Sequence, residues 1–355
     1  MNKLFSWAWG DRESPQKSVA QKHVNLALQG GGAHGAFTWG VLDHLLEDGR
    51  LAIDSISGAS AGEVNAVMLA DGLVRGGPEE ARKRLADFWR AASIGGSLPE
   101  LQRHVVERLF LANSLPGPMK AWLNTMGGLL SPTDLNPLNI NPLKQLIERF
   151  VDFNAIRADT SRELFISATN VWTGDLRIFT RDEITAEAVM ASACLPLLFR
   201  AVEIDGVPYW DGGYTANPPL LPFLQENTTD LLIVQVYPQA RNKLPASTRD
   251  IMGRASEIAF NTPLLAELRA IERIQRQDAA RGVAPRLRLH RIALEALDES
   301  FDAASRLHNS YELFDRLRRL GHEAAQRFLD AHFENIGMRG TIDLGTDADA
   351  EQVNA

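Results

Sequence analysis

The sequence predicts an α/β fold in which a mostly parallel sheet is covered by helices. Short apolar runs of strand length alternate with amphipathic stretches of helix length. The first two of these runs each end in a glycine-containing turn that leads directly into a helical pattern. A strand-turn-helix unit that is repeated in this way requires parallel strands. We therefore expect one α/β domain that carries an insert.

The first predicted unit begins with a buried strand at residues 24–29. A glycine-rich turn follows at residues 30–35, and a helix is expected over residues 36–48 because its apolar side chains recur on one face and Gly49 can end it. The second unit has the same order, with a strand, a turn and a helix at residues 53–57, 58–62 and 61–70.

Later segments extend the sheet and add helices. In chain order we expect a strand, a hairpin arm, a helix, two strands, a long helix, a strand and a second long helix, at residues 164–169, 171–180, 186–193, 207–210, 230–236, 251–279, 286–292 and 309–334. Residues 93–143 break this rhythm, because Lys120 and Asp134 are the only charged residues between positions 111 and 143. This insert is either a lid that contacts lipid or a loop-rich stretch packed on its own domain.

Composition excludes several classes of protein. The chain has 355 residues, of which 45% are hydrophobic and 23% are charged, as in ordinary globular proteins. The net charge of −8 gives no general attraction to nucleic acid, so no nucleic-acid partner is expected. Cys194 is the only cysteine, which rules out an intramolecular disulfide. No signal peptide or run of 18 apolar residues is found, and a cytoplasmic protein is expected.

The segment GASAG at residues 58–62 fits G-x-S-x-G, the nucleophile elbow. It lies between a predicted strand and a predicted helix, as that motif requires. Gly58 and Gly62 would allow a turn so sharp that bulkier neighbours would crowd the serine. Ser60 would then present its hydroxyl above the sheet edge, at the positive end of a helix.

Residues 30–35 satisfy two mechanisms. Gly30, Gly32 and Gly35 match the dinucleotide-binding fingerprint, and Asp54 follows at the usual separation. The same loop offers backbone N–H groups at a helix N-terminus, as an oxyanion hole requires. The second use is favoured because the next strand ends in a nucleophile elbow, and because Asp54 lies at the start of that strand. The dinucleotide site stays as an alternative.

A serine hydroxyl is a weak nucleophile until a neighbour accepts its proton. His290 alone follows the Ser…Asp…His order of α/β-hydrolases, which leaves a triad as a second alternative, although its predicted strand lacks an exposed loop. The other histidines, His44 and His322 among them, are expected to have surface or packing roles. A carboxylate in a dry site can also accept the proton. Asp211, in an Asp-Gly-Gly segment that alone would be read as a turn, is then the candidate base.

The three motifs in this order resemble the signatures of patatin-like phospholipases. They are GGGAHG at residues 30–35, GASAG at residues 58–62 and DGG at residues 211–213. The segment ASACLP at residues 191–196 and Asn65 also resemble that family, and the likeness covers about residues 23–237. The resemblance implies a three-layer sandwich around the central sheet, with an apolar insert and a helical C-terminal part.

The resemblance also implies the site residues. Ser60 and Asp211 would form a catalytic dyad, and the backbone amides of Gly30, Gly31 and Gly32 would form the oxyanion hole. Supporting glycines in the same motifs are Gly35, Gly58, Gly62, Gly212 and Gly213. No metal or cofactor is required for this chemistry.

One departure from the family is His34, where members often carry Arg or Lys. It affects any cationic contribution at the glycine loop and leaves the backbone donors unchanged. The expected organisation is a flexible leader, a catalytic domain with its insert at about residues 93–143, a helical C-terminal part and a disordered acidic tail, at residues 1–22, 23–240, 241–338 and 339–355.

The sequence thus leads to the expectation of a serine acyl hydrolase whose substrate is a lipid ester or phospholipid. Bulky replacements at Gly31 should be nearly as damaging as loss of Ser60, because removal of one oxyanion donor costs on the order of 10²–10³ in rate. Since the overall charge is negative, transient contact with a membrane surface would have to be local and apolar.

Overall fold

The computed structural model describes residues 21–93, 141–196, 198–241, 244–294 and 310–342. The strands are β1 (Lys22–Leu28), β2 (Leu51–Gly58), β3 (Glu163–Asn170), β4 (Leu176–Thr180), β5 (Val202–Ile204), β6 (Val207–Asp211), β7 (Asp230–Gln235) and β8 (Arg288–Ala293). The α-helices are α1 (Gly35–Asp48), α2 (Ala61–Ala92), α6 (Pro142–Phe150), α7 (Phe153–Ala158), α8 (Ala186–Ser192), α9 (Thr248–Ala280) and α10 (Tyr311–His332). Short 3-10 helices include η1 (Gly32–His34), η3 (Gly212–Tyr214) and η4 (Leu221–Gln225).

The strands form one sheet in the order β5-β6-β3-β2-β1-β7-β8, and β4 also pairs with β3. The pairs from β3 through β2, β1 and β7 to β8 are parallel, whereas β4, β5 and β6 pair in antiparallel fashion. Leu28 at the end of β1 lies opposite Gly58 on one side and Val234 on the other. The carboxyl ends of the central strands therefore meet at one edge, where loops can build a site.

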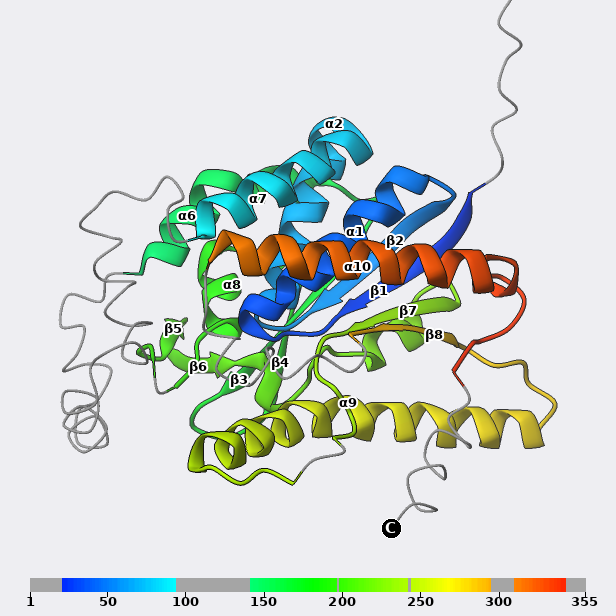
Figure 1. The fold of residues 1–355 in the computed structure, drawn as a ribbon. Coiled ribbons are helices and arrows are strands. Elements are labelled where there is room, and N and C mark those ends of the chain that lie inside the picture. Colours follow the sequence, from blue (N-terminus) through cyan, green and yellow to red (C-terminus); the bar gives the residue numbers. More distant parts are fainter. Residues whose placement is uncertain (1–20, 94–140, 197, 242–243, 295–309, 343–355) are drawn as a thin grey trace, which may run out of the picture.

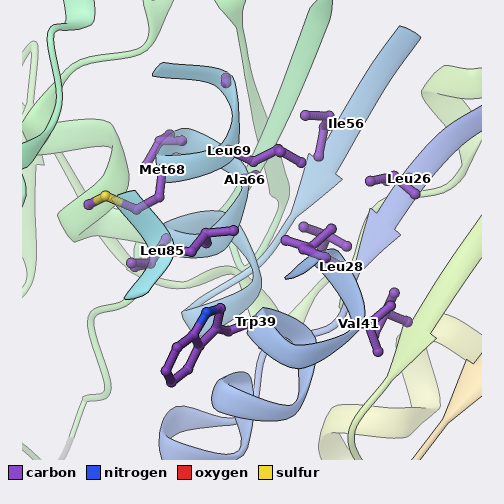
Figure 2. Close-up of a cluster of buried hydrophobic side chains, with 14 of the residues drawn as sticks. Leu26, Leu28, Trp39, Val41, Ile56, Ala66, Met68, Leu69 and Leu85 are labelled. Carbon is purple, nitrogen blue, oxygen red and sulfur yellow. The ribbon is translucent and has the colours of Figure 1, made fainter. Parts of the chain in front are cut away.

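Helices cover both faces of the sheet, so the fold has three layers (Figure 1). Leu26 and Leu28 of β1 face the layer that contains α1, α2 and α10, and Figure 2 shows them beside Ile56 of β2. Ala27 faces the opposite way, into a smaller cluster that includes Leu264 of α9. This alternation is the period of two expected for a strand buried on both faces. The predicted fold class is confirmed.

The C-terminal helix α10 packs closely on α1. A Cβ atom added at Gly40 would overlap the Arg318 carbonyl, and one added at Gly321 would overlap the Phe37 carbonyl. Glycine on each side thus lets the two helix backbones approach without a side chain between them. The long C-terminal part contributes both this helix and a strand, β8, to the sheet domain (Figure 1).

The second predicted helix is longer than expected. It continues past Asp71 to Gly77, where φ is 75° and the backbone is not helical, and a second helical segment after this kink completes α2 (Ala61–Ala92). Asp71 is a buried carboxylate that pairs with Arg75 on the next turn and accepts a 2.8 Å hydrogen bond from the Asp152 backbone. It serves as a structural anchor rather than a stop signal.

Several expectations concern segments outside the described residues. These are most of the leader, nearly all of the insert at residues 93–143 and the end of the acidic tail. Within the described part of the chain, no helix is both long and apolar enough to cross a membrane.

Candidate active site

Ser60 occupies the sharp turn between β2 and α2. Its φ of 53° and ψ of −123° place a non-glycine residue in a strained region of backbone space. A Cβ at Gly58 would lie 2.5 Å from the Glu63 Cα, and one at Gly62 would overlap the Leu28 carbonyl. Both flanking glycines are therefore required by close backbone approach, and the turn leaves Ser60 partly exposed.

Asp211 ends β6 and is completely buried. Pairing of β6 with β3 places it opposite Ala168, and β3 separates β6 from β2, the strand that carries the elbow. Its Oδ1 accepts a 2.8 Å hydrogen bond from the Gly213 backbone, whereas Oδ2 makes no hydrogen bond of standard geometry. The Ser60 side chain is close enough to lower the pKa of Asp211 by hydrogen bonding. The structure thus brings Ser60 and Asp211 together in one site.

The acidity of Asp211 is set by competing effects. Burial raises the pKa of this carboxyl from 3.8 to about 7, and the hydrogen bonds from Gly213 and Ser60 oppose that rise. Charged groups lose hydration when buried, so the neutral form is favoured. A carboxylate with a pKa near 7 is a much stronger base than an exposed aspartate and is still ionised at neutral pH in a large fraction of molecules.

The glycine loop lies against the elbow. A Cβ at Gly30 would be 2.5 Å from the Ala59 carbonyl oxygen and 2.7 Å from the Ser60 Cβ. The Gly30 N–H donates a 2.8 Å hydrogen bond to Oδ1 of Asn217, so this donor is already used. Among the described residues, none accepts a hydrogen bond from the N–H of Gly31 or Gly32. These two groups are free to receive a ligand oxygen.

Three polar residues around the site were not predicted from the sequence. Asn217 accepts from Gly30 and donates to the Phe260 carbonyl at 3.1 Å. Ser192 in α8 accepts a 3.1 Å hydrogen bond from the Ser60 backbone N–H and so fixes the elbow from the other side. Of the three, only Ser192 could have been found from the sequence, because it lies in the ASACLP segment that resembles the family.

The third is Glu63, which follows the elbow on α2 and is fully buried. Burial raises its pKa well above 4.5, a hydrogen bond with the Ser192 side chain lowers it, and the nearby Asp211 charge raises it further. The neutral form of this carboxyl is therefore favoured more than in an exposed glutamate, because its charged form would lie buried beside Asp211.

Asn65 connects the helix that follows the elbow to the glycine loop. Its side-chain nitrogen donates to the Gly35 carbonyl at 3.0 Å, and its oxygen accepts from Nε1 of Trp89 at 3.0 Å. The first turn of α2 is thereby tied to the end of the glycine loop. The Asn65 match to the family motif has a structural reason in this contact.

The residues of the two alternative sites, His290 of the triad and Asp54 of the dinucleotide site, lie elsewhere. His290 is buried in β8, where Nε2 lies 3.0 Å from Asp230, and β1 and β7 lie between β8 and β2. Asp54 lies within β2 and contacts His23, away from the carboxyl end where a ribose-binding acid belongs. The geometry therefore supports neither the triad nor the dinucleotide alternative.

Cys194 has a structural position beside the site. It is buried, its carbonyl accepts a 2.9 Å hydrogen bond from the Asp211 backbone, and burial raises the pKa of its thiol to about 12. Such a thiol is not a nucleophile at neutral pH.

Comparisons with known proteins show limited similarity to solved structures. VipD from Legionella pneumophila is 14% identical with a TM-score of 0.42, and the match covers 88% of this chain and 68% of that chain. The ExoU–SpcU complex from Pseudomonas aeruginosa contains a chain that is 18% identical with a TM-score of 0.37, with 88% and 52% covered.

Sequence similarity is more informative. The uncharacterized protein R571 of Acanthamoeba polyphaga mimivirus is 26% identical over 227 residues, which is 60% of this chain and 65% of that protein. This chain thus spans less than two thirds of the viral protein. Residues 26–224, which contain all three motifs, match the model of the family described as patatin-like phospholipase. This match covers more than half of the sequence, and the chain belongs to the patatin-like phospholipase family.

Proposed function

We propose that the protein is a serine acyl hydrolase that cleaves lipid esters through a covalent acyl-enzyme. The observation that carries this proposal is the buried Asp211, whose pKa is raised to about 7 by burial and whose free Oδ2 lies in the same site as the strained Ser60. A carboxylate with this pKa can take the serine proton directly. Family membership supports a lipid substrate.

In the first half of the reaction, Oδ2 of Asp211 accepts the proton of the Ser60 hydroxyl while Oγ attacks the ester carbonyl carbon. The N–H groups of Gly31 and Gly32 donate to the oxyanion that forms. Gly30 has a supporting part, because its N–H holds Asn217 and so fixes the loop. When the tetrahedral intermediate collapses, the alcohol leaves with the proton from Asp211, and Ser60 keeps the acyl group.

In the second half, water replaces the alcohol. Asp211 takes a proton from this water, the hydroxide attacks the acyl carbonyl, and the same N–H groups hold the second oxyanion. Collapse releases the fatty acid and returns the proton to Ser60 Oγ. Each half-reaction ends with Asp211 ionised, so the cycle closes without a metal or cofactor as a reactant.

Exposed apolar side chains on Tyr214 and along α9 support a lipid-contacting surface. Tyr214, next to the DGG segment, is 44% exposed and its ring lies 5.0 Å from that of Phe260 in α9. On the same helix the exposed side chains of Ile251, Met252 and Ile258 face solvent. We propose that this part of α9 contacts the lipid surface, since exposed apolar groups of this kind mark interaction sites.

Fluorophosphonate labelling with peptide mapping tests the chemistry. We expect the label on Ser60 in the wild type, and no label in Ser60→Ala. Asp211→Asn should lose at least about 10³-fold in ester hydrolysis, whereas His290→Ala should keep its turnover in whatever fraction folds. Ser161→Ala, which removes an exposed serine, is the matched control. Activity of Asp211→Asn close to that of the wild type would reject the dyad.

Vesicle co-sedimentation tests the proposed lipid-contacting surface of α9 separately from the chemistry. Ile251→Asp and Met252→Asp should weaken binding to phosphatidylcholine vesicles but leave hydrolysis of a soluble short-chain ester unchanged. Met338→Asp is the control, because Met338 is 78% exposed and lies beyond α10. Equal vesicle binding by all three variants and the wild type would reject this surface.

A further inference from the structure

A second cluster of chemically reactive side chains lies away from Ser60, between α1 and α10. His44 and Glu47 are one turn apart on α1, and His322 faces them from α10. One nitrogen of each histidine and one carboxylate oxygen all lie within 4.8 Å of one another. His44 is about 13 Å along the helix from Gly35, so the cluster is separate from the glycine loop.

The distances in this cluster match a metal site. Nδ1 of His44 lies 3.3 Å from Nε2 of His322, which in turn lies 3.0 Å from Oε2 of Glu47. Two ligands that each bind zinc at about 2.0–2.1 Å in tetrahedral geometry are themselves about 3.3 Å apart. The two separations that involve His322 are therefore close to those of ligands around one small ion, and the third pair of ligand atoms, from His44 and Glu47, lies within 4.8 Å.

Hydrogen bonding alone accounts for this arrangement less well. Nε2 of His322 carries at most one hydrogen, and it faces both His44 Nδ1 and Glu47 Oε2. If that hydrogen points to Oε2 of Glu47, the lone pair on Nδ1 of His44 has no hydrogen of its own to accept. If Nε2 of His322 carries no hydrogen, its lone pair faces the carboxylate of Glu47. A cation at the centre would satisfy all three groups.

We propose that His44, Glu47 and His322 bind one Zn²⁺ ion, with water as the fourth ligand, and that this ion joins α1 to α10. Imidazole and carboxylate are suitable ligands for zinc, and the ring-nitrogen pair disfavours Mg²⁺ and Ca²⁺, which prefer oxygen. This inference does not depend on the proposed hydrolase activity.

The surroundings prepare the cluster for a metal. Nη2 of Arg82 donates to the other carboxylate oxygen, Oε1 of Glu47, at 3.2 Å, which orients Oε2 toward the histidines.

A bound ion would stabilise the contact between the two helices. The side chains come from positions 278 residues apart, which explains why the sequence, read locally, predicts no metal site. Because α1 begins where the glycine loop ends, and α10 is the last long helix described, the ion would link the C-terminal part to the element behind the loop. We assign it a structural role, because Ser60 and Asp211 do not take part.

Calorimetric titration of untagged, chelator-treated full-length protein with ZnCl₂ tests the proposal. We expect one tight site per chain in the wild type. With free Zn²⁺ at about 100 times the dissociation constant, Tm should rise by about 4 °C. His44→Ala, His322→Ala and Glu47→Gln should each weaken binding by about tenfold or more. His332→Ala removes a histidine of the same helix outside the cluster and should bind as the wild type does.

Two further readouts keep the result unambiguous. Cobalt(II) should give the visible absorption of a tetrahedral site in the wild type, and this absorption should be lost in Glu47→Gln, which preserves side-chain volume. Fluorophosphonate labelling of Ser60 should be the same in all these variants, so failure of the metal site and failure of the hydrolase proposal are distinguishable. A wild-type titration without a stoichiometric site, or unchanged affinity in the three variants, would overturn the proposal.

Discussion

The side-chain oxygen of Asn217 accepts a hydrogen bond from the backbone N–H of Gly30 across 2.8 Å, although the two residues are 187 positions apart. The contact ties the glycine loop to the segment that follows the DGG motif. The side-chain nitrogen of Asn217 donates to the Phe260 carbonyl, so one buried side chain positions three segments of the chain.

Replacement of Asn217 by alanine should therefore disturb the oxyanion loop without removing any reacting group. The buried Gly30 N–H would lose its acceptor, which typically costs about 1–3 kcal/mol. We expect a lower Tm and a fall in kcat of about tenfold or more, measured with a short-chain ester. Asn154→Ala, at a surface asparagine, should change neither quantity. Wild-type turnover in Asn217→Ala would show that the loop keeps its shape without this bond.

The rate should depend on pH through Asp211. Since burial raises its pKa to about 7, the carboxylate that accepts the serine proton is lost as pH falls below about 7. We expect kcat/KM on a neutral ester to rise about tenfold per pH unit on the acid side and to level off above pH 8. An acid limb centred near pH 4 would mean that Asp211 is ionised much more easily than its burial implies.

Asp211→Asn should make the protein more stable at high pH while it abolishes activity. The folded state binds the Asp211 proton more tightly than the unfolded chain does, so this group stabilises the fold below about pH 4 and that contribution is lost as pH rises through about 7. Urea unfolding at pH 8 should show a gain on the order of 1–3 kcal/mol for the variant. The gain should shrink at pH 5.5. A loss of stability at both pH values would contradict this expectation.

A rescue experiment tests the free N–H groups of the loop. A Cβ at Gly31 would lie 2.6 Å from a methyl carbon of Val236, so Gly31→Ala must push the loop away. We expect kcat to fall by about 10²–10³. Because φ at Gly31 is 178°, which any residue can adopt, Val236 is the main obstacle. Gly31→Ala/Val236→Ala should recover much of the loss, with Val236→Ala as the reference. No recovery would place the obstacle in the backbone.

The elbow could be predicted because its geometry is local. Gly58, Ser60 and Gly62 lie within five positions, and the strand before them and the helix after them follow from hydrophobic periodicity. The sheet and its helical layers were predictable for the same reason. Asp211 needed more, because an Asp-Gly dipeptide is usually a turn, and it was distinguished only by the serine's need for a base and by the order of the three motifs.

The remaining features depend on contacts between distant segments. Asn217, Ser192 and Glu63 are ordinary polar residues in the sequence, and their surroundings become polar and buried only when β2, β6 and α8 meet. Asp71, where the helix was expected to end, is held inside the fold by ion pairs and by a hydrogen bond from the Asp152 backbone. Local helix signals cannot report such tertiary contacts.

The family match ends at residue 224, before β7 begins at Asp230, yet β7 lies beside β1 in the middle of the sheet. A fragment cut at the end of the match would leave β1 with a bare hydrogen-bonding edge and an open apolar face, the combination that promotes aggregation. It would also lack Val236, the wall behind Gly31. The smallest piece of this chain that can keep its sheet intact is therefore longer than the part by which its family is identified.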